Sequence, residues 1–241
     1  MTVNPVAENV LGTIGTICWT VQLIPQIWKS FRTKSTDGLS EWLVLLWGIS
    51  GVFLGTYNIV QKFNVPLIIQ PHLFCALALS SWGQCQYYGR RRSATAALAM
   101  CIGVMVVCAG FEVGMIFALR PAYERGQTSG VKAFGVLFSV LVAVGLLPEY
   151  YEIWKKKEVI GISVTFMLID AAGGIFSDLS LAFAPEFDIT AAVGYTLVTA
   201  MDMVVIVAAL ILNPRANRRR RLIESNEPSM ENVQDQQSVT V

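Results

Sequence analysis

The sequence has little charge and almost no histidine. Only 15% of its 241 residues are charged and 54% are hydrophobic, whereas about a quarter of an ordinary soluble domain is charged, so the composition excludes a soluble globule or a disordered chain. One histidine excludes multi-histidine metal sites, and a net charge of +1 gives no general attraction for nucleic acid. The chain also lacks a phosphate-binding glycine loop, a GxSxG elbow and zinc-type cysteine spacing. We therefore expect no enzyme, no metal or other cofactor and no nucleic-acid partner.

The chain contains several long apolar runs. A membrane-spanning helix needs about 20 mostly apolar residues to cross a hydrocarbon core about 30 Å thick. These runs are too long for barrel strands and lack their alternation. The sequence therefore predicts an all-α membrane protein with seven transmembrane helices. The predicted spans are 10–28, 42–60, 63–88, 93–119, 133–153, 160–184 and 189–212.

The basic residues predict the orientation of these spans. The loops and tail on the side of the C-terminus hold 14 Lys and Arg residues, and the other side holds 4. Cytosolic loops carry this excess, so we expect a luminal N-terminus at 1–9 and a cytosolic C-terminus. The polar residues of 213–241 predict a disordered tail.

An internal repeat relates the two ends of the chain. A shift of 123 residues superposes Pro25 on Pro148 and Lys34 on Lys157, among 10 identities over 50 positions. This shift contains four spans, an even number, so both copies have the same orientation in the membrane. The result is a 3+1+3 plan, one known transporter architecture. It divides the chain into a first three-helix bundle at 10–88, a connector helix at 93–119 and a second bundle at 133–212.

The repeated segments resemble the PQ-loop family. Residues 23–29 read LIPQIWK and residues 34–40 read KSTDGLS, and the second copy has LPE at 147–149 and LIDAAGG at 168–174. The latter stretch is similar to the LLDxxGG segment of the lysosomal cystine transporter. The resemblance implies a lysosomal or vacuolar exporter of cystine or cationic amino acids, and more distant relatives are the SWEET sugar carriers and the KDEL receptors. The second copy departs from the family pattern because Glu149 replaces the glutamine.

The two prolines predict paired hinges. A proline inside a helix removes one backbone hydrogen bond and clashes with the preceding turn, so Pro25 and Pro148 should each kink a helix. Gln26 and Glu149, which follow them, can make hydrogen bonds at the kinks. The alternative is that both prolines only bend packed helices.

Carboxyl groups at membrane depth are the sharpest functional signal, because each costs at least ~2.5 kcal/mol at mid-bilayer. Asp170 lies about 15 Å from the cytosolic end of its span and Asp202 about 20 Å from the luminal end of its span, so both are close to the midplane. We expect them to couple protons to transport, with structural hydrogen bonding as the alternative. Glu149, Asp178 and His72 are weaker candidates for a proton or polar role.

Other polar residues on the pore-facing spans are weaker candidates for lining a substrate site, because each such residue more often serves packing than ligand contact. The expected function is proton-coupled export of a small polar solute, favouring an amino acid, across a vacuolar or lysosomal membrane. A KDEL-receptor-like sorting receptor and a SWEET-like sugar facilitator are the alternatives. The expected partners are then the solute, protons and the lipid bilayer. A second copy of the chain, in a homo-oligomer, is a further candidate partner. The candidate lining residues are Gln22, Trp47, Tyr57, Asn58 and Tyr195.

Overall fold

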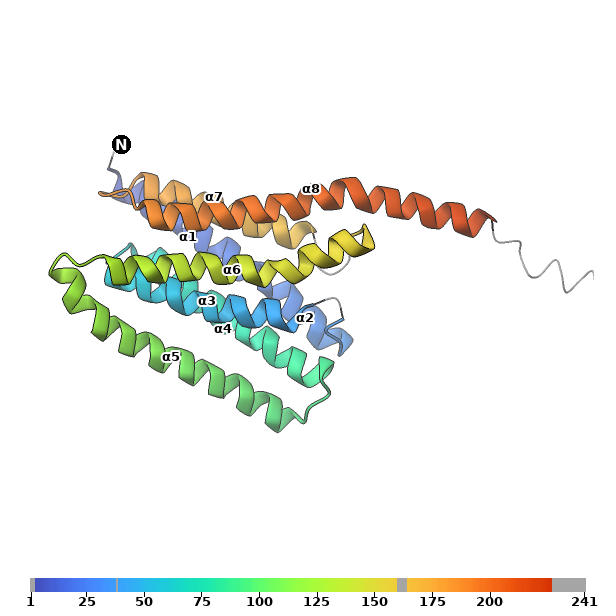
Figure 1. Ribbon diagram of the computed structural model, residues 1–241, viewed down its shortest axis with the longest axis horizontal. Helices are drawn as coiled ribbons and strands as arrows, with labels where there is room; N and C mark the ends of the chain where they lie inside the picture. Colours follow the sequence, from blue (N-terminus) through green and yellow to red (C-terminus); the bar gives the residue numbers. More distant parts are fainter. Residues whose placement is uncertain (1–2, 38, 160–163, 227–241) are drawn as a thin grey trace, which may run out of the picture.

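Long helices account for nearly all of the fold (Figure 1). The computed structural model describes residues 3–37, 39–159 and 164–226, so Gly38 and residues 161–163 of the repeated motif lie outside the described residues. A short π-helical turn at Cys85–Gly89 extends the fourth helix. The helices are α1 (Pro5–Val21), α2 (Leu23–Thr33), α3 (Glu41–Val60), α4 (Val65–Gln84), α5 (Ala94–Glu124), α6 (Ser129–Lys156), α7 (Val164–Ala182) and α8 (Ile189–Asn226).

The prediction of an all-α membrane protein is confirmed. Seven helical stretches are long and apolar enough to cross a membrane, with α1 and α2 together forming the first, and the described residues contain no strand. The first stretch begins at Pro5, earlier than predicted. The Asn4 side chain caps it by accepting hydrogen bonds from the backbone N–H groups of Val6 and Ala7, and proline fits the first turn of a helix.

The predicted disordered tail differs from the structure over 213–226, where α8 continues as a helix (Figure 1). Local contacts explain the extension. The Asn213 side chain accepts a hydrogen bond from the Val159 N–H at 2.8 Å and donates to the Val159 carbonyl at 3.2 Å. Arg220 pairs with Glu158 on the same connection between α6 and α7. Side chains that the sequence suggested were only solvated therefore hold the helix in place.

The proline-containing helices of the two repeats end in the same way, at equivalent positions of the repeat. Lys34 after α2 and Lys157 after α6 are both left-handed cap residues with φ of 53°. The helices differ at the prolines themselves. The helix containing Pro25 is divided at Gln22 into α1 and α2, whereas α6 continues through Pro148.

The helices of each repeat share one pattern of neighbours. In the first repeat α4 contacts both α1 and α3, and in the second α8 contacts both α6 and α7. The repeats meet where α1 lies against α7 and α3 against α6, and α5 covers α3 and α4. A two-fold axis along the bundle would relate these two sets of contacts.

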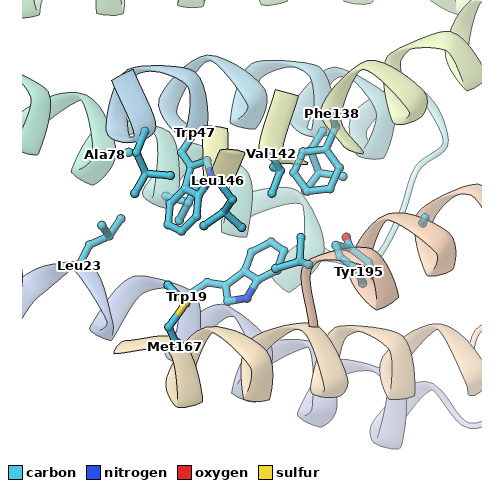
Figure 2. Packing of buried hydrophobic residues seen from close by; sticks show 14 of the residues in the cluster. Trp19, Leu23, Trp47, Ala78, Phe138, Val142, Leu146, Met167 and Tyr195 are labelled. Atoms are coloured by element: carbon cyan, nitrogen blue, oxygen red, sulfur yellow. The ribbon is translucent and has the colours of Figure 1, made fainter. Parts of the chain in front are cut away.

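The main hydrophobic core lies where the repeats meet. Figure 2 shows Trp19 of α1 and Trp47 of α3 among side chains from the second repeat, including Leu146 of α6, Met167 of α7 and Tyr195 of α8. The rings of Trp19 and Tyr195 have their centroids 5.6 Å apart in an edge-on arrangement. Each repeat therefore buries its apolar face against the other.

Candidate functional site

Asp170 on α7 joins the second repeat to the bend in the first. It is buried, and its Oδ1 accepts a hydrogen bond of 3.0 Å from Nε2 of Gln22, the residue between α1 and α2. Pro25 has no N–H to offer the Val21 carbonyl, which accounts for the interruption between α1 and α2 at Gln22. The Trp19 indole N–H donates to the Asp170 backbone carbonyl at 3.0 Å.

Two glycines after Asp170 allow these close approaches. A Cβ on Gly173 would overlap the indole ring of Trp19, and a Cβ on Gly174 would overlap the Thr199 hydroxyl of α8. The LIDAAGG stretch therefore carries one carboxyl group and two glycines. The glycines allow α1 to pack closely on one side of α7 and α8 on the other.

Asp202 on α8 is the second carboxyl group of the site. It is fully buried, and neither of its oxygens accepts a hydrogen bond from an N–H or O–H group in the described part of the chain. Its interaction partner is the Asp170 carboxyl group. Two interacting carboxylates repel each other, and protonation of either one removes that repulsion. Asp170 and Asp202 therefore form one buried pair of carboxyl groups, contributed by α7 and α8.

The space beside this pair is too small for a solute. A cavity of ≈ 10 Å³ is lined by Asp170 and by apolar or aromatic residues of both repeats, including Trp47, Phe74 and Val198. A water molecule needs about this much space. The cavity that these described residues enclose therefore has no room for a solute.

Four of the residues predicted to line a substrate site are buried: Gln22, Trp47, Asn58 and Tyr195. Asn58 and Tyr195 interact with each other through their side chains. Gln22 Oε1 and Trp47 Nε1 have no hydrogen-bond partner among residues that the structure describes. Buried polar atoms are normally paired, so these two atoms are available to a bound molecule.

The remaining predicted site residues lie away from the pair. Glu149 is buried on α6, where its charged neighbours are Glu152 and Lys156 of the same helix. Asp178 is partly exposed, and its Oδ2 accepts a hydrogen bond of 2.8 Å from Thr196.

The other predicted proton carrier and the proline motif are also peripheral. His72 contacts Glu112 of α5 at 3.0 Å, so this pair joins α4 to the connector helix. Pro25 and Pro148 both have exposed side chains, so each proline lies on the outer side of its helix. Gln26 donates to Ser30 one turn along α2 at 3.3 Å.

Asp188 is a functional candidate that the sequence analysis missed. It precedes α8 and caps it by accepting from the Ala191 N–H at 2.9 Å. It also accepts hydrogen bonds from the Tyr57 hydroxyl at 2.6 Å and the Gln61 amide at 2.8 Å, both at the end of α3. An Asp before an apolar run signals a helix cap, but no sequence pattern predicts its contact with the other repeat.

Asp188 lies beside a cavity, at the end of the bundle where α1 begins. This cavity has a volume of ≈ 310 Å³ and is lined in part by Glu8, Lys62, Glu186 and Asp188. Further hydrogen bonds join the repeats at the same end, including Asn64 to Ser180 at 3.1 Å. The Asp188 contacts therefore join the two repeats beside this outer cavity.

These features define a multi-pass helical membrane protein with an internally duplicated unit and a buried pair of carboxyl groups. The PQ loop repeat family matches residues 7–67 and 130–188, and the chain belongs to this family.

Three relatives illustrate the family. An uncharacterised protein of Schizosaccharomyces pombe is 41% identical over 210 residues, which cover 87% of this chain and 74% of that protein. A vacuolar lysine transporter of Saccharomyces cerevisiae, YPQ1, is 33% identical over 81 residues, covering 34% of this chain and 26% of the transporter. A cystinosin homolog of Dictyostelium discoideum is 24% identical, with 95% of this chain and 90% of that protein covered.

Proposed function

We propose that the protein exports an amino acid or a similar small polar solute from an acidic lumen and couples this transport to protons. The observation that carries the proposal is the buried pair of Asp170 and Asp202, which lies beside the bend at Gln22. Burying carboxyl groups in a membrane is costly, and proton relays are a common reason for it.

Alternating access would come from the two repeats moving against each other as three-helix bundles, with α5 as the connector. Their neighbour contacts support this 3+1+3 arrangement, because α4 and α8 occupy equivalent places in the two repeats. The hydrogen bond from Gln22 to Asp170 crosses between the repeats next to Pro25. A change of charge on Asp170 would act directly on a bent segment of the opposite repeat.

The unpaired polar atoms support an amino acid as the solute. Oxygen atoms of Gln22 and Asp202 can accept hydrogen bonds from an ammonium group. The Trp47 N–H can donate to a carboxylate. A zwitterion would satisfy both kinds of atom, and the lysine transporter among the relatives supports the same class.

The direction of transport depends on the orientation of the chain. With the N-terminus luminal, the cavity beside Asp188 would face the lumen and the Asp188 contacts would close that side. Opening these contacts would admit solute and a proton, and release would follow at the basic, cytosolic end. The relatives named as vacuolar transporters support a vacuolar or lysosomal membrane.

A pH-dependent sorting receptor is the second candidate, since the same carboxyl pair could make binding depend on protons without any flux. A sugar facilitator is the third, and the buried carboxyl pair favours proton coupling over it. Transport of solute across a membrane separates a transporter from a receptor.

The direct test is uptake by proteoliposomes that contain the purified full chain. A panel of radiolabelled amino acids is offered with and without an imposed pH gradient. We expect one or a few amino acids to accumulate, and only while the gradient lasts. Binding without accumulation would favour the receptor, and gradient-independent sugar flux would favour the facilitator.

A further inference from the structure

The proline-containing helices of both repeats end in the same exposed pair of aromatic rings. At the end of α2 the rings of Trp28 and Phe31 have their centroids 6.0 Å apart, and at the end of α6 those of Tyr151 and Trp154 are 6.2 Å apart. The 123-residue shift superposes Trp28 on Tyr151 and Phe31 on Trp154. The arrangement is therefore part of the repeated unit.

A lysine completes each pair three residues further on. Lys34 and Lys157 adopt the same left-handed backbone conformation, which turns the chain back over the end of the helix. The ammonium group of Lys34 lies 4.0 Å from the ring centroid of Phe31, and that of Lys157 lies 5.3 Å from that of Trp154. Neither lysine forms an ion pair within the described ranges.

These rings are not part of the core. Trp28 is 58% exposed, Phe31 50%, Tyr151 61% and Trp154 67%. The helical stretches that carry them have 29 and 28 residues, so they are about 44 and 42 Å long, close to the ~40–45 Å of a bilayer with its headgroups. The last turn of each stretch therefore falls at the level of the headgroups, where aromatic rings with a polar neighbour are most favourable.

We propose that these two clusters are equivalent docking surfaces for anionic phospholipids, and we call them ring–lysine anchors. The first consists of Trp28, Phe31 and Lys34, and the second of Tyr151, Trp154 and Lys157. In each anchor the rings insert among the headgroups, and the lysine donates hydrogen bonds to the phosphate or carboxylate of an anionic lipid. Contact with the ring restricts where the ammonium group lies, which distinguishes Lys34 and Lys157 from Lys29 and Lys155. Arg32 also contacts a ring of the first anchor, with its guanidinium 6.0 Å from the Trp28 centroid.

The anchors would hold the ends of both proline-containing helices at the membrane surface. Bending at Pro25 or Pro148 would then move the inner part of the helix while its end stays at the headgroups. The docking itself does not depend on transport, so it is tested by lipid binding alone.

The experiment measures lipid binding to the purified full chain in detergent micelles by native mass spectrometry. Phosphatidylserine is titrated, with phosphatidylcholine as the uncharged comparison. We expect the wild type to bind two phosphatidylserine molecules more tightly than any phosphatidylcholine. The double variant K34Q/K157Q should weaken both by about five-fold, since one basic residue near a headgroup contributes about that factor.

A matched variant separates the anchors from general charge. Lys29 and Lys155 carry the same charge near the ends of α2 and α6 but contact no aromatic ring among the described residues. We expect K29Q/K155Q to keep the two tight phosphatidylserine molecules. Equal weakening by the two double variants would overturn the proposal, as would a wild type without a preference for phosphatidylserine.

A second double variant tests the rings while leaving every charge in place. F31L/W154L keeps both lysines, and we expect it to lose most of the preference for phosphatidylserine. An unchanged preference would mean that the rings do not position the lysines, and the proposal would fail. All the substituted side chains are exposed, so circular dichroism should show the same helix content in every variant.

Discussion

Two contacts between the repeats occupy equivalent places in the duplicated fold, and one of them is polar whereas the other is apolar. The 123-residue shift superposes Gln22 on Gly145 and Trp47 on Asp170. Gln22 donates a hydrogen bond to Asp170, whereas Gly145 lies against Trp47, where an added Cβ would be 3.0 Å from the indole ring. Duplication thus supplies two equivalent places in the scaffold, and the chain uses only one of them for a buried carboxyl group.

The cost of buried charge gives a physical reason for this difference. Each ionisable group near the middle of a membrane costs several kcal/mol unless it is paired or neutralised. A carboxyl group at both places would double that cost. With the carboxyl groups of Asp170 and Asp202 both on the second repeat, the first repeat contributes the amide and the indole rings that surround them. The predictions below test this division, beginning with the largest expected effect.

Asp170→Asn tests the carboxyl side of the comparison. The amide is nearly isosteric but cannot release a proton, so we expect accumulation driven by a pH gradient to fall to the level of empty liposomes. Exchange of labelled for unlabelled solute should survive in part, because it needs no net proton movement. Proteoliposome uptake measures both. The control is Asp178→Asn, and if Asp170→Asn kept full driven uptake, Asp170 would not carry the coupling proton.

Asp202→Asn should have a different effect if Asp202 mainly contacts the solute. We expect binding to weaken by about 10- to 100-fold at every pH, which corresponds to the ~1.5–3 kcal/mol of a hydrogen bond to a charged group. Equilibrium binding of the transported amino acid at several pH values measures this. A loss of binding confined to one end of the pH range would instead assign Asp202 to the proton.

Gly173→Ala tests whether the first repeat needs space next to Asp170. The added Cβ would overlap Trp19, so we expect the free energy of unfolding to fall by about 1–3 kcal/mol. Gly103→Ala is the matched control, because no atom lies within 4 Å of a Cβ there. That substitution should be neutral or stabilising, since alanine favours a helix by roughly 0.5–1 kcal/mol over glycine. Equal thermal unfolding shifts in detergent would contradict the proposed fit.

The sequence predicted the helices of this fold better than it predicted their contacts. Runs of about 20 apolar residues have few alternatives in a membrane, and a repeated Pro and Lys make the duplication visible. Asp170 was found for the same reason, since a charge inside an apolar run is conspicuous. Trp19 and Asp188 were missed because an aromatic residue in an apolar run and an acid before a helix are both ordinary. Their roles come from contacts with residues more than 100 positions away.

Substitution of the two prolines should have smaller effects on turnover, and the effect should differ between the two positions. Pro25 lies just after the division between α1 and α2, whereas α6 continues through Pro148. Pro→Ala restores a helix donor and relieves the clash with the preceding turn. We expect Pro25→Ala to lower turnover roughly several-fold and Pro148→Ala to lower it less, with membrane expression of both unchanged. Unchanged flux in both variants would leave the prolines as static kinks.

The smallest effect is expected from Tyr57→Phe, which tests the hydrogen bonds that join the repeats at the N-terminal end. The substitution removes the hydroxyl that donates to Asp188 but keeps the ring in the core. Asp188 still accepts from Gln61 and from the Ala191 N–H, so we expect a loss of only about 1 kcal/mol. A looser contact should let solute pass from the outer cavity to the centre more readily, which would raise the initial rate of uptake from that side up to about five-fold. Tyr123→Phe is the control, because the Tyr123 hydroxyl makes only a long contact of 3.4 Å with Gln61. If the two variants raised the rate equally, or neither did, the contacts of Asp188 would not be what closes this side of the molecule.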